Sequence, residues 1–389
     1  MTERLYEQNA YCRSFEATVA AVEKENGRYI VTLDKSAFFP EGGGQPGDRG
    51  TIGGCAVSDT QMNAGGEILH YMKKEPDFAA GEKVSCALDW TLRFARMQAH
   101  TGEHIVSGLA HRLTGAENVG FHMDGTLMTV DFDLPLSKET LDEIERQANE
   151  RVYENAAVRA FFPSPAEAEN LVYRSKLEFV ERLRLVEIEG VDLCACCAPH
   201  VKRTGEIGLI KILTAVSHRG GVRITLLCGR SAYEDYAVKY KNTLYCADLL
   251  KEKHNELPRA LDALLEKEGA LRLKLAAASK KYTDQVISSA PRCAGHGAVF
   301  VEEATNEELC RIAEACKTRC GGISACFGGD DCKGYCFAMS LPDEKYLPFT
   351  KTILEALRGR GGGKGCFLQG KCAAGRAEIE AFFAGFAML

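Results

Sequence analysis

The sequence predicts an α+β protein built from several domains. Its 389 residues exceed the length of about 250–300 residues at which a single hydrophobic core stops growing. Short β-forming runs separated by turns fill the chain before position 90, and amphipathic helical patterns alternate with further β-rich runs after it. We expect an N-terminal β-barrel domain over 1–89, an α+β domain over 90–230, a helical arm over 231–285 and a glycine-rich α/β domain over 286–389.

The barrel prediction rests on three β-rich runs, Thr18–Val22, Tyr29–Leu33 and Val84–Leu88, which turn residues separate. Between them lies the segment Pro40–Asp48, which contains three successive glycines at 42–44. Glycine adopts positive φ without steric cost and admits the close approach of another group. The segment is therefore either a tight hairpin turn or a loop against which a ligand lies.

Three helices are expected in the second domain. Asp89 is a suitable N-cap for a helix from Trp90 to about Leu113, whose apolar residues recur at helical spacing. Two further helices are expected over Lys138–Val158 and Ala166–Lys176. Strands are expected over three later runs, the last two joined by the turn Arg219-Gly220-Gly221: Leu183–Ile188, Ile207–Ala215 and Val222–Cys228.

The helical arm covers Ser231 to about Asp284, a polar helical pattern that Pro258 interrupts. Because proline breaks a helix interior, we expect two antiparallel helices rather than one long coiled coil. The module that follows, from about Val286, holds nine of the 17 cysteines of the chain and ends with the glycine run Gly359–Gly365.

Composition and charge exclude several classes of protein. The 46% of hydrophobic and 26% of charged residues match a globular average and exclude wholesale disorder. A formal net charge of −6 argues against indiscriminate coating of nucleic acid, although the residues from 351 onward carry +3. No apolar run reaches the about 18 residues of a membrane span, and the N-terminus lacks the pattern of a signal peptide. We expect a cytoplasmic protein without membrane contact.

Two residue pairs, far apart in the sequence, predict one metal site. His100 and His104 stand at i and i+4 on the first expected helix, so both imidazoles lie on one face. Cys196 and His200 add a thiolate and a third imidazole, and zinc is commonly held by such mixed ligands. A reducing compartment would keep the cysteines as thiols or metal ligands. We therefore predict a Zn²⁺ ion bound by these four residues.

The role of this site and the choice of cysteine stay open at this stage. Cys194 and Cys197 lie close enough in sequence to replace Cys196, and a closed zinc site that only stabilises the fold is an alternative. The first pair also matches the His-x-x-Glu-His motif of inverzincin metalloproteases, in which Glu103 would be the general base. Those enzymes complete the site with a carboxylate, whereas this chain offers Cys196 and His200. An exposed helical glutamate is the other interpretation of Glu103.

Three motifs, in this order, resemble those of one family. They are the segment from Phe38 to Gly50, the pair His100 and His104, and Cys196 with His200 followed by Thr204–Gly208. Motifs of this kind occur in the editing half of alanyl-tRNA synthetases and in the freestanding alanyl-tRNA editing proteins. The resemblance covers residues 1 to about 230. The run Arg360–Gly365 with Gln369-Gly370 is similar to the glycine-rich C-terminal domain of the same synthetases, which DHH phosphoesterases share.

The resemblance implies a long freestanding editing protein, because motifs of an aminoacylation domain are missing from the sequence. Such a protein hydrolyses, in trans, the ester of tRNA(Ala) mischarged with serine or glycine, and it carries a zinc editing domain. A non-catalytic tRNA-binding protein is the remaining alternative. The chain departs from the family at three places, one of which is the final glycine run, interrupted by Cys366 and Lys371. It has Ser36-Ala37-Phe38-Phe39 where the family has Thr-Ala-Phe-Tyr, and Cys196-Cys197-Ala198-Pro199-His200 where the synthetase has Cys-Gly-Gly-Thr-His.

Within this resemblance, Ser36 is the candidate for pairing with the serine hydroxyl of the substrate. Alanine would leave such a buried polar group unpaired, which is a strong basis for rejecting it. Candidates for binding the ester or assisting its hydrolysis are Gln45, Glu103 and the backbone amides of Gly42, Gly43 and Gly44.

The C-terminal module has a separate expected role. Arg360 and Lys364 lie in its basic, glycine-rich part and are candidates for contacts with tRNA phosphates. A homodimer interface is the alternative, and the two roles are compatible. The nine cysteines of this module lack a standard zinc spacing, so we expect buried thiols there.

Overall fold

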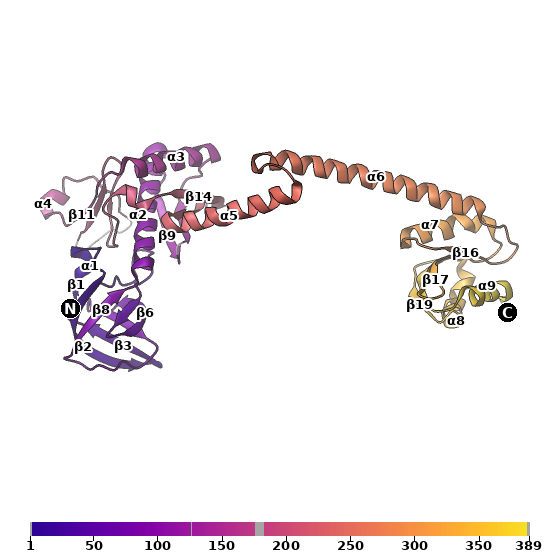
Figure 1. Ribbon diagram of the computed structural model, residues 1–389, viewed down its shortest axis with the longest axis horizontal. Helices are drawn as coiled ribbons and strands as arrows, with labels where there is room; N and C mark the ends of the chain where they lie inside the picture. The colour runs from indigo at the N-terminus through magenta and orange to yellow at the C-terminus, as the bar shows by residue number, and fades with distance from the viewer. Residues whose placement is uncertain (1, 126, 176–182, 387–389) are drawn as a thin grey trace. The chain divides into compact units, whose positions relative to one another are not determined.

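The computed structural model describes residues 2–125, 127–175 and 183–386. The chain forms two compact units, Met1–Tyr245 and Cys246–Leu389, each of which mixes helices and strands (Figure 1). The prediction of a mixed α+β protein with an N-terminal barrel is confirmed. Among the described residues, no helix has both the length and the apolar character needed to cross a membrane.

The first unit begins with a closed barrel of six strands. In spatial order the strands are β2 (Ser14–Glu25), β3 (Arg28–Leu33), β7 (Ile68–Met72), β6 (Cys55–Met62), β5 (Gly50–Ile52) and β8 (Lys83–Leu88). Val31, Leu33 and Ile52 are fully or almost fully buried in its core. The short elements β1 (Glu3–Arg4), α1 (Leu5–Gln8) and β4 (Lys35–Ser36) complete this part, with β1 and β4 parallel.

Helix α2 (Trp90–Thr114) runs from the barrel through the middle of the first unit (Figure 1). The side chain of Asp89 accepts a hydrogen bond from the amide of Leu92, which confirms the predicted N-cap. Gly115 ends the helix with φ of 73°, a left-handed conformation that glycine adopts readily. The middle of α2 is buried on all sides, so its polar side chains face other parts of the unit rather than water.

A four-stranded antiparallel sheet packs with α2 to form the main core of the unit. Its order is β14 (Ile210–His218), β15 (Gly221–Cys228), β10 (Leu127–Phe132) and β9 (Asn118–Asp124). The predicted hairpin around Arg219 is confirmed, although β14 begins at Ile210 because Thr204–Ile207 forms the 3-10 helix η1. Strands β9 and β10 were not predicted.

Helix α3 (Lys138–Glu154) is shorter than predicted. It ends because Asn155 adopts φ of 52° as its C-cap, and Val158 instead begins strand β11 (Val158–Phe161). Strand β11 pairs with β12 (Leu185–Ile188), which pairs with β13 (Asp192–Ala195).

The predicted helix Ala166–Lys176 is wrong. Only the four residues of α4 (Pro165–Ala168) are helical, and Lys176 lies outside the described residues. No residue of α4 is buried, so no apolar face stabilises a longer helix there.

The predicted helical arm consists of α5 (Gly229–Leu250), the 3-10 helix η2 (His254–Glu256) and α6 (Leu257–Ser289). Pro258 lies in the first turn of α6 and therefore starts this helix rather than interrupting one. A proline is tolerated there because the first amides of a helix have no partner within it. The boundary between the two compact units falls within α5, so the antiparallel packing of the helices stays a prediction.

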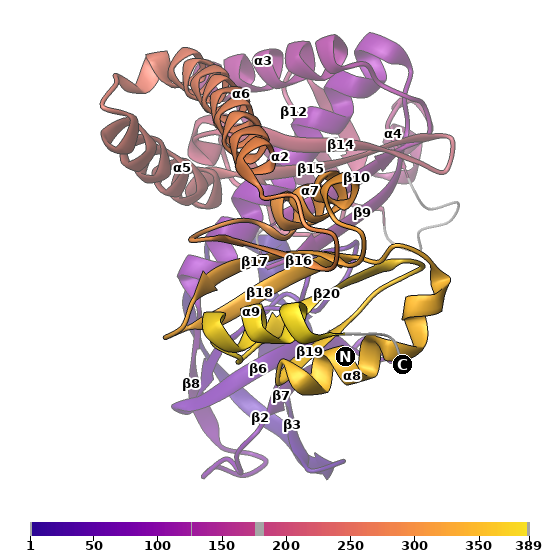
Figure 2. The ribbon, with the colours of Figure 1, turned by 90° about the vertical axis from the view of Figure 1, so that its right-hand side faces the viewer.

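The second unit contains a five-stranded sheet with helices on both faces (Figure 2). The strand order is β16 (Gly297–Val301), β17 (Ser324–Asp330), β18 (Gly334–Ser340), β20 (Phe367–Cys372) and β19 (Gly359–Gly362), and only β16 and β17 are parallel. Helix α7 (Asn306–Cys316) covers one face, and α8 (Thr350–Ala356) with α9 (Arg376–Gly385) covers the other. The 3-10 helices η3 (Lys317–Arg319) and η4 (Glu344–Phe349) connect these elements.

Candidate metal centre and its cavity

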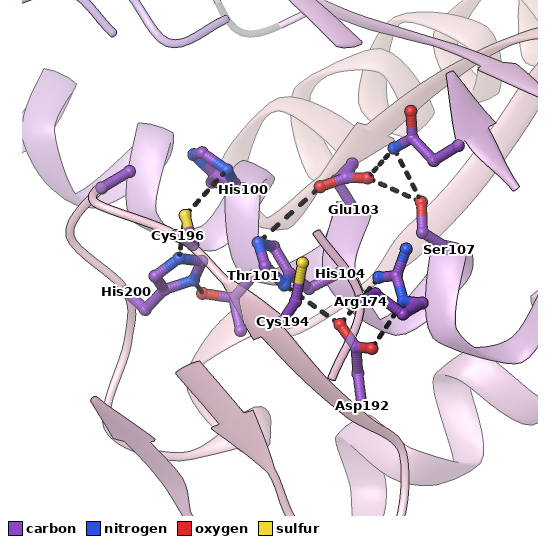
Figure 3. Close-up of polar contacts among 12 residues, drawn as sticks. His100, Thr101, Glu103, His104, Ser107, Arg174, Asp192, Cys194, Cys196 and His200 are labelled. Atoms are coloured by element: carbon purple, nitrogen blue, oxygen red, sulfur yellow. Dashed lines mark hydrogen bonds and ion pairs between the residues drawn. The ribbon is translucent and has the colours of Figure 1, made fainter. Parts of the chain in front are cut away.

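The structure brings the four predicted metal ligands together in the first unit (Figure 3). His100 and His104 project from α2, and Cys196 and His200 from the segment after β13. Cys196 Sγ lies 3.6 Å from His100 Nε2 and 3.3 Å from His200 Nε2. One ligand atom from each of the four residues lies within 4.8 Å of the others. We call these four residues the ligand cluster.

Each imidazole of the ligand cluster has a protein acceptor at its Nδ1 atom. His100 Nδ1 lies 2.9 Å from Gln45 Oε1, and His104 Nδ1 lies 3.1 Å from Asp192 Oδ2. These acceptors hold the proton on Nδ1, which leaves Nε2 unprotonated for an ion.

His200 is held in the same way, by a hydroxyl. Its Nδ1 lies 3.0 Å from Thr101 Oγ1, and that hydroxyl donates its own proton to the carbonyl of Met97 at 2.7 Å. Thr101 therefore accepts from the imidazole. Three imidazoles with free Nε2 atoms beside one thiol match the ligands that Zn²⁺ prefers in proteins.

Charge in and around the cluster favours a thiolate. Burial alone would raise the pKa of the Cys196 thiol, but the imidazoles of His100 and His200 lower it well below its usual value. Burial also raises the pKa of Asp192, and hydrogen bonds from His104 and Arg174 outweigh this and lower it to about 2. Metal ions bind thiolate rather than thiol, so this environment suits a cation.

Asp192 is fixed on its other side by Arg174. Arg174 Nε and Nη2 donate to the two carboxylate oxygens at 2.7 and 2.8 Å, a bidentate ion pair. Cys194 lies near His104 and Asp192, and these three form a second group of possible ligand atoms. Cys196 is the cysteine that adjoins the other imidazoles, as predicted.

The ligand cluster lines a cavity of about 430 Å³. Glu103 also lines it, and this side chain is buried rather than exposed. Its carboxylate accepts hydrogen bonds from Ser107 Oγ at 2.6 Å and from Asn118 Nδ2. The remaining lining residues are Gly43, Val119, Gly120, Phe121, Arg174, Arg184, Cys194, Ala195 and Cys197.

Comparison with known proteins decides the family. Residues 183–225, which include Cys196 and His200, match the second additional domain of threonyl and alanyl tRNA synthetases, and residues 7–92 match the class II (A) tRNA synthetases. The alanyl-tRNA editing protein AlaX-L of Pyrococcus horikoshii is 31% identical over 70% of this chain and 69% of its own. This chain belongs to the family of alanyl-tRNA editing proteins.

Two further relatives cover different shares of the chain. The editing protein AlaX-M of Methanosarcina mazei is 37% identical over 54% of this chain and 90% of its own length. The editing protein Aarsd1-A of Xenopus laevis is 28% identical, but it covers 90% of this chain and 87% of its own. The resemblance predicted from the motifs is confirmed.

The glycine segment of this editing family member contributes one residue to the cavity. Gly43 lines it, whereas Gly42 forms a bridge with Gln45. Gly44 has φ of 82°, and a Cβ atom there would lie 2.5 Å from the carbonyl oxygen of Phe121. Gly44 is thus required by packing against β9, and the amides of the three glycines do not all line the cavity.

Gln45 is buried and acts through His100. Its Oε1 accepts from the imidazole, and its Nε2 is buried without a hydrogen-bond partner among the described residues. The structure therefore places Gln45 behind a metal ligand rather than among the residues that line the cavity.

Ser36 is not among the residues that line the cavity. It is fully buried, its Oγ lies 2.8 Å from His70 Nε2, and it accepts from the amide of Phe38 at 3.1 Å. Because His70 Nδ1 donates to the carbonyl of Val31 at 2.8 Å, the Ser36 hydroxyl donates to Nε2. The hydroxyl is engaged within the barrel domain, and its role toward a substrate stays a prediction.

Arg360 and Lys364 belong to the second unit. Arg360 lies on β19 and Lys364 in the turn after it, and both are exposed. Of the nine cysteines after residue 286, Cys316, Cys326 and Cys372 are buried, so the expectation of buried thiols is right for three of them. In the described part of this unit, no group of cysteines, histidines or acids is arranged to hold a metal.

Sequence reasoning missed four residues of this site: Thr101, Arg174, Arg184 and Asp192. Thr101 lies between His100 and His104, and Asp192 lies four residues before Cys196, so both are close in sequence to predicted ligands. Arg174 falls in the segment wrongly predicted to be helical, and Arg184 begins no recognisable motif.

Proposed function

We propose that this protein hydrolyses the ester of tRNA(Ala) mischarged with serine, and also that of glycyl-tRNA(Ala), acting in trans. The observation that carries the proposal is the ligand cluster, with its Nδ1 acceptors, on the wall of a cavity in a member of the alanyl-tRNA editing family. Hydrolysis of the wrong ester is needed because the alanine pocket of an aminoacylating enzyme cannot strongly reject serine or glycine by binding alone.

The ligand cluster would hold Zn²⁺, which when bound would supply a fixed positive charge beside the ester and the terminal ribose. Gln45, Asp192 and Thr101 fix the imidazoles in the tautomer that binds it. We assign Glu103 the role of accepting a hydrogen bond from the attacking water, since its carboxylate lines the cavity in a fixed orientation.

Selectivity for the serine hydroxyl is proposed for Ser36. Its Oγ would exchange the bond to His70 for one to the substrate. For the second unit, we propose that Arg360 and Lys364 contact tRNA phosphates, with homodimerisation as an additional role.

A metalloprotease is the rival enzyme. A protease zinc needs a position left for water, whereas this cluster offers four protein ligands. An aminoacyl ester is already activated, so its hydrolysis needs only a positioned water and a polarised carbonyl. The four-ligand set therefore favours ester over peptide hydrolysis.

One assay tests the proposal. The metal-loaded protein is incubated with Ser-, Gly- and Ala-tRNA(Ala) and with an unfolded peptide. We expect loss of the first two esters, with Ala-tRNA(Ala) and the peptide intact. Glu103→Gln should reduce the rate about 10²- to 10⁴-fold while metal content is retained. Glu117→Gln, at an exposed glutamate just beyond α2, is the matched control and should leave the rate unchanged.

Two results would contradict the proposal. Cleavage of the peptide would favour the metalloprotease. Retention of tRNA without release of an amino acid would favour a non-catalytic binding protein.

A further inference from the structure

Arg184 is a buried cation that has no anionic partner among the described residues. Its exposed fraction is 6%, and it lines the cavity beside the ligand cluster. Its two hydrogen bonds both come from Nη1 and both end on neutral carbonyls, of Cys196 at 2.8 Å and of Ala198 at 2.9 Å. Its Nε atom is buried and has no hydrogen-bond partner within the described ranges.

The other buried arginines are paired. Arg93 and Arg96 both lie within ion-pair distance of Asp48. Arg174, the second arginine of the cavity, forms its bidentate pair with Asp192. For the residues that the structure describes, Arg184 has no carboxylate oxygen within 4.0 Å. A buried guanidinium is stabilised when a charge compensates it, so an anionic ligand would be favoured at this position.

We infer that Arg184 forms a subsite for the phosphate attached to the terminal ribose of the substrate. This inference rests on the proposed function. In an aminoacyl-tRNA the ester and the 5′-phosphate of the last nucleotide are carried by the same ribose. Arg184 and Cys196 are joined through their backbones as well, since the amide of Cys196 donates to the carbonyl of Arg184 at 3.0 Å. An ester carbonyl at the ligand cluster therefore brings the phosphate within one ribose of this guanidinium.

Guanidinium suits this ligand better than other side chains would. It presents its N–H groups in a plane that matches two phosphate oxygens, and the bonds are charge-assisted. The carbonyls of Cys196 and Ala198 hold the group in one orientation before the substrate arrives. Arg184 is thus a positioning residue that sets the register of the acceptor end relative to the ligand cluster.

The test compares AMP with adenosine, which differ by the 5′-phosphate alone. Dissociation constants are measured by ligand-observed NMR titration on the full-length, metal-loaded protein. We expect AMP to bind at least about tenfold more tightly than adenosine, as one charge-assisted hydrogen bond allows. Arg184→Gln should reduce this ratio to about one, and Arg184→Lys should keep most of it.

Arg159→Gln is the matched control. Arg159 lies on β11 of the same three-stranded sheet but is exposed and does not line the cavity, so its loss should leave the ratio unchanged. Because Arg184→Gln also weakens the bonds to two carbonyls, thermal unfolding and metal content are measured alongside. Arg184→Lys keeps the test decisive if the glutamine variant does not fold, since a lysine variant with a ratio of one would overturn the inference.

Three outcomes would overturn it. Equal binding of AMP and adenosine by the wild-type protein would mean that no phosphate subsite exists. A preference for AMP that persists in folded Arg184→Gln would place the subsite elsewhere. Binding of free serine that depends on Arg184, without a preference for AMP, would assign the guanidinium to the carboxylate of the released amino acid.

The inference and the proposed function fail separately. The binding assay involves no hydrolysis, so a preference for AMP that depends on Arg184 can stand even when Ser-tRNA(Ala) is left intact. Conversely, deacylation with equal binding of AMP and adenosine would remove the subsite and leave the activity.

Discussion

Buried histidines of the cavity and of the barrel core differ in how their ring nitrogens are bonded. In the ligand cluster, each imidazole has an acceptor at Nδ1, which directs its Nε2 toward the other ligands. In the barrel, both nitrogens of His70 are bonded within the protein, one to the carbonyl of Val31 and the other to the hydroxyl of Ser36. Burial and residue type therefore do not identify a metal site. What identifies it is that Nε2 atoms of several fixed imidazoles converge on one thiol.

Metal content gives the largest expected contrast between the two regions. His104→Gln should lose the bound zinc, because it removes one of four ligands, whereas His70→Gln should keep about one equivalent. Elemental analysis of the purified proteins measures both.

The cysteines of the same loop provide the matched control. Cys196→Ala should lose the metal and Cys197→Ala should keep it, since only the first thiol adjoins two imidazoles. The opposite result would show that the ligand assignment is wrong.

Acid should lower the stability of the protein through His70 in the barrel. Burial lowers the pKa of His70 to about 4, whereas an unfolded chain has a histidine pKa of about 6.5. Between these values the unfolded state binds the extra proton, so the free energy of unfolding should fall as pH falls from 6.5 to 4. The expected loss is about 3 kcal/mol, and it should level off below pH 4.

Denaturant unfolding of the wild type and of His70→Gln at pH 7 and pH 4.5 checks this. The ligand cluster also responds to acid, but it does so equally in both proteins. The difference between them isolates His70. An equal pH dependence in the two proteins would contradict the expectation.

A smaller effect on metal binding is expected when the acceptor behind His104 is replaced. Asp192→Asn keeps the shape of the side chain but loses the charge that binds His104 and Arg174. Replacing an acceptor behind a metal ligand typically lowers metal affinity about 10- to 100-fold, and competition with a chelator measures this. Asp142→Asn, at an exposed site on α3, should leave the affinity unchanged.

The smallest effect is expected at Ser36. Ser36→Val should reduce the free energy of unfolding by about 1–3 kcal/mol, because His70 Nε2 and the amide of Phe38 lose their partner. Under the proposed function, it should also lower the ratio of Ser-tRNA(Ala) to Ala-tRNA(Ala) hydrolysis, and Ser36→Thr should restore both. A folded Ser36→Val protein with an unchanged ratio would limit Ser36 to the barrel domain.

The sequence predicted the features that depend on local spacing. His100 and His104 follow from the helical period, Cys196 and His200 from a short motif, and the N-cap Asp89 from the residue before an amphipathic pattern. Each of these depends on residues within a few positions of one another.

The features that local spacing could not reveal depend on contacts between distant segments. Asp192 and Gln45 reach the imidazoles only once β13 and the glycine segment pack against α2. The position of Ser36 depends on where His70 lies after the barrel closes. The helix expected from Ala166 does not form for a related reason, because no residue of α4 is buried against another part of the protein.

The ligand cluster also implies an order of events during synthesis. His100 and His104 leave the ribosome almost a hundred residues before Cys196 and His200. Until the later pair emerges, α2 carries two imidazoles with no thiolate opposite them. Tight retention of the ion should therefore begin only when the chain has been translated beyond residue 200, which makes metal loading a late marker of a correctly assembled first unit.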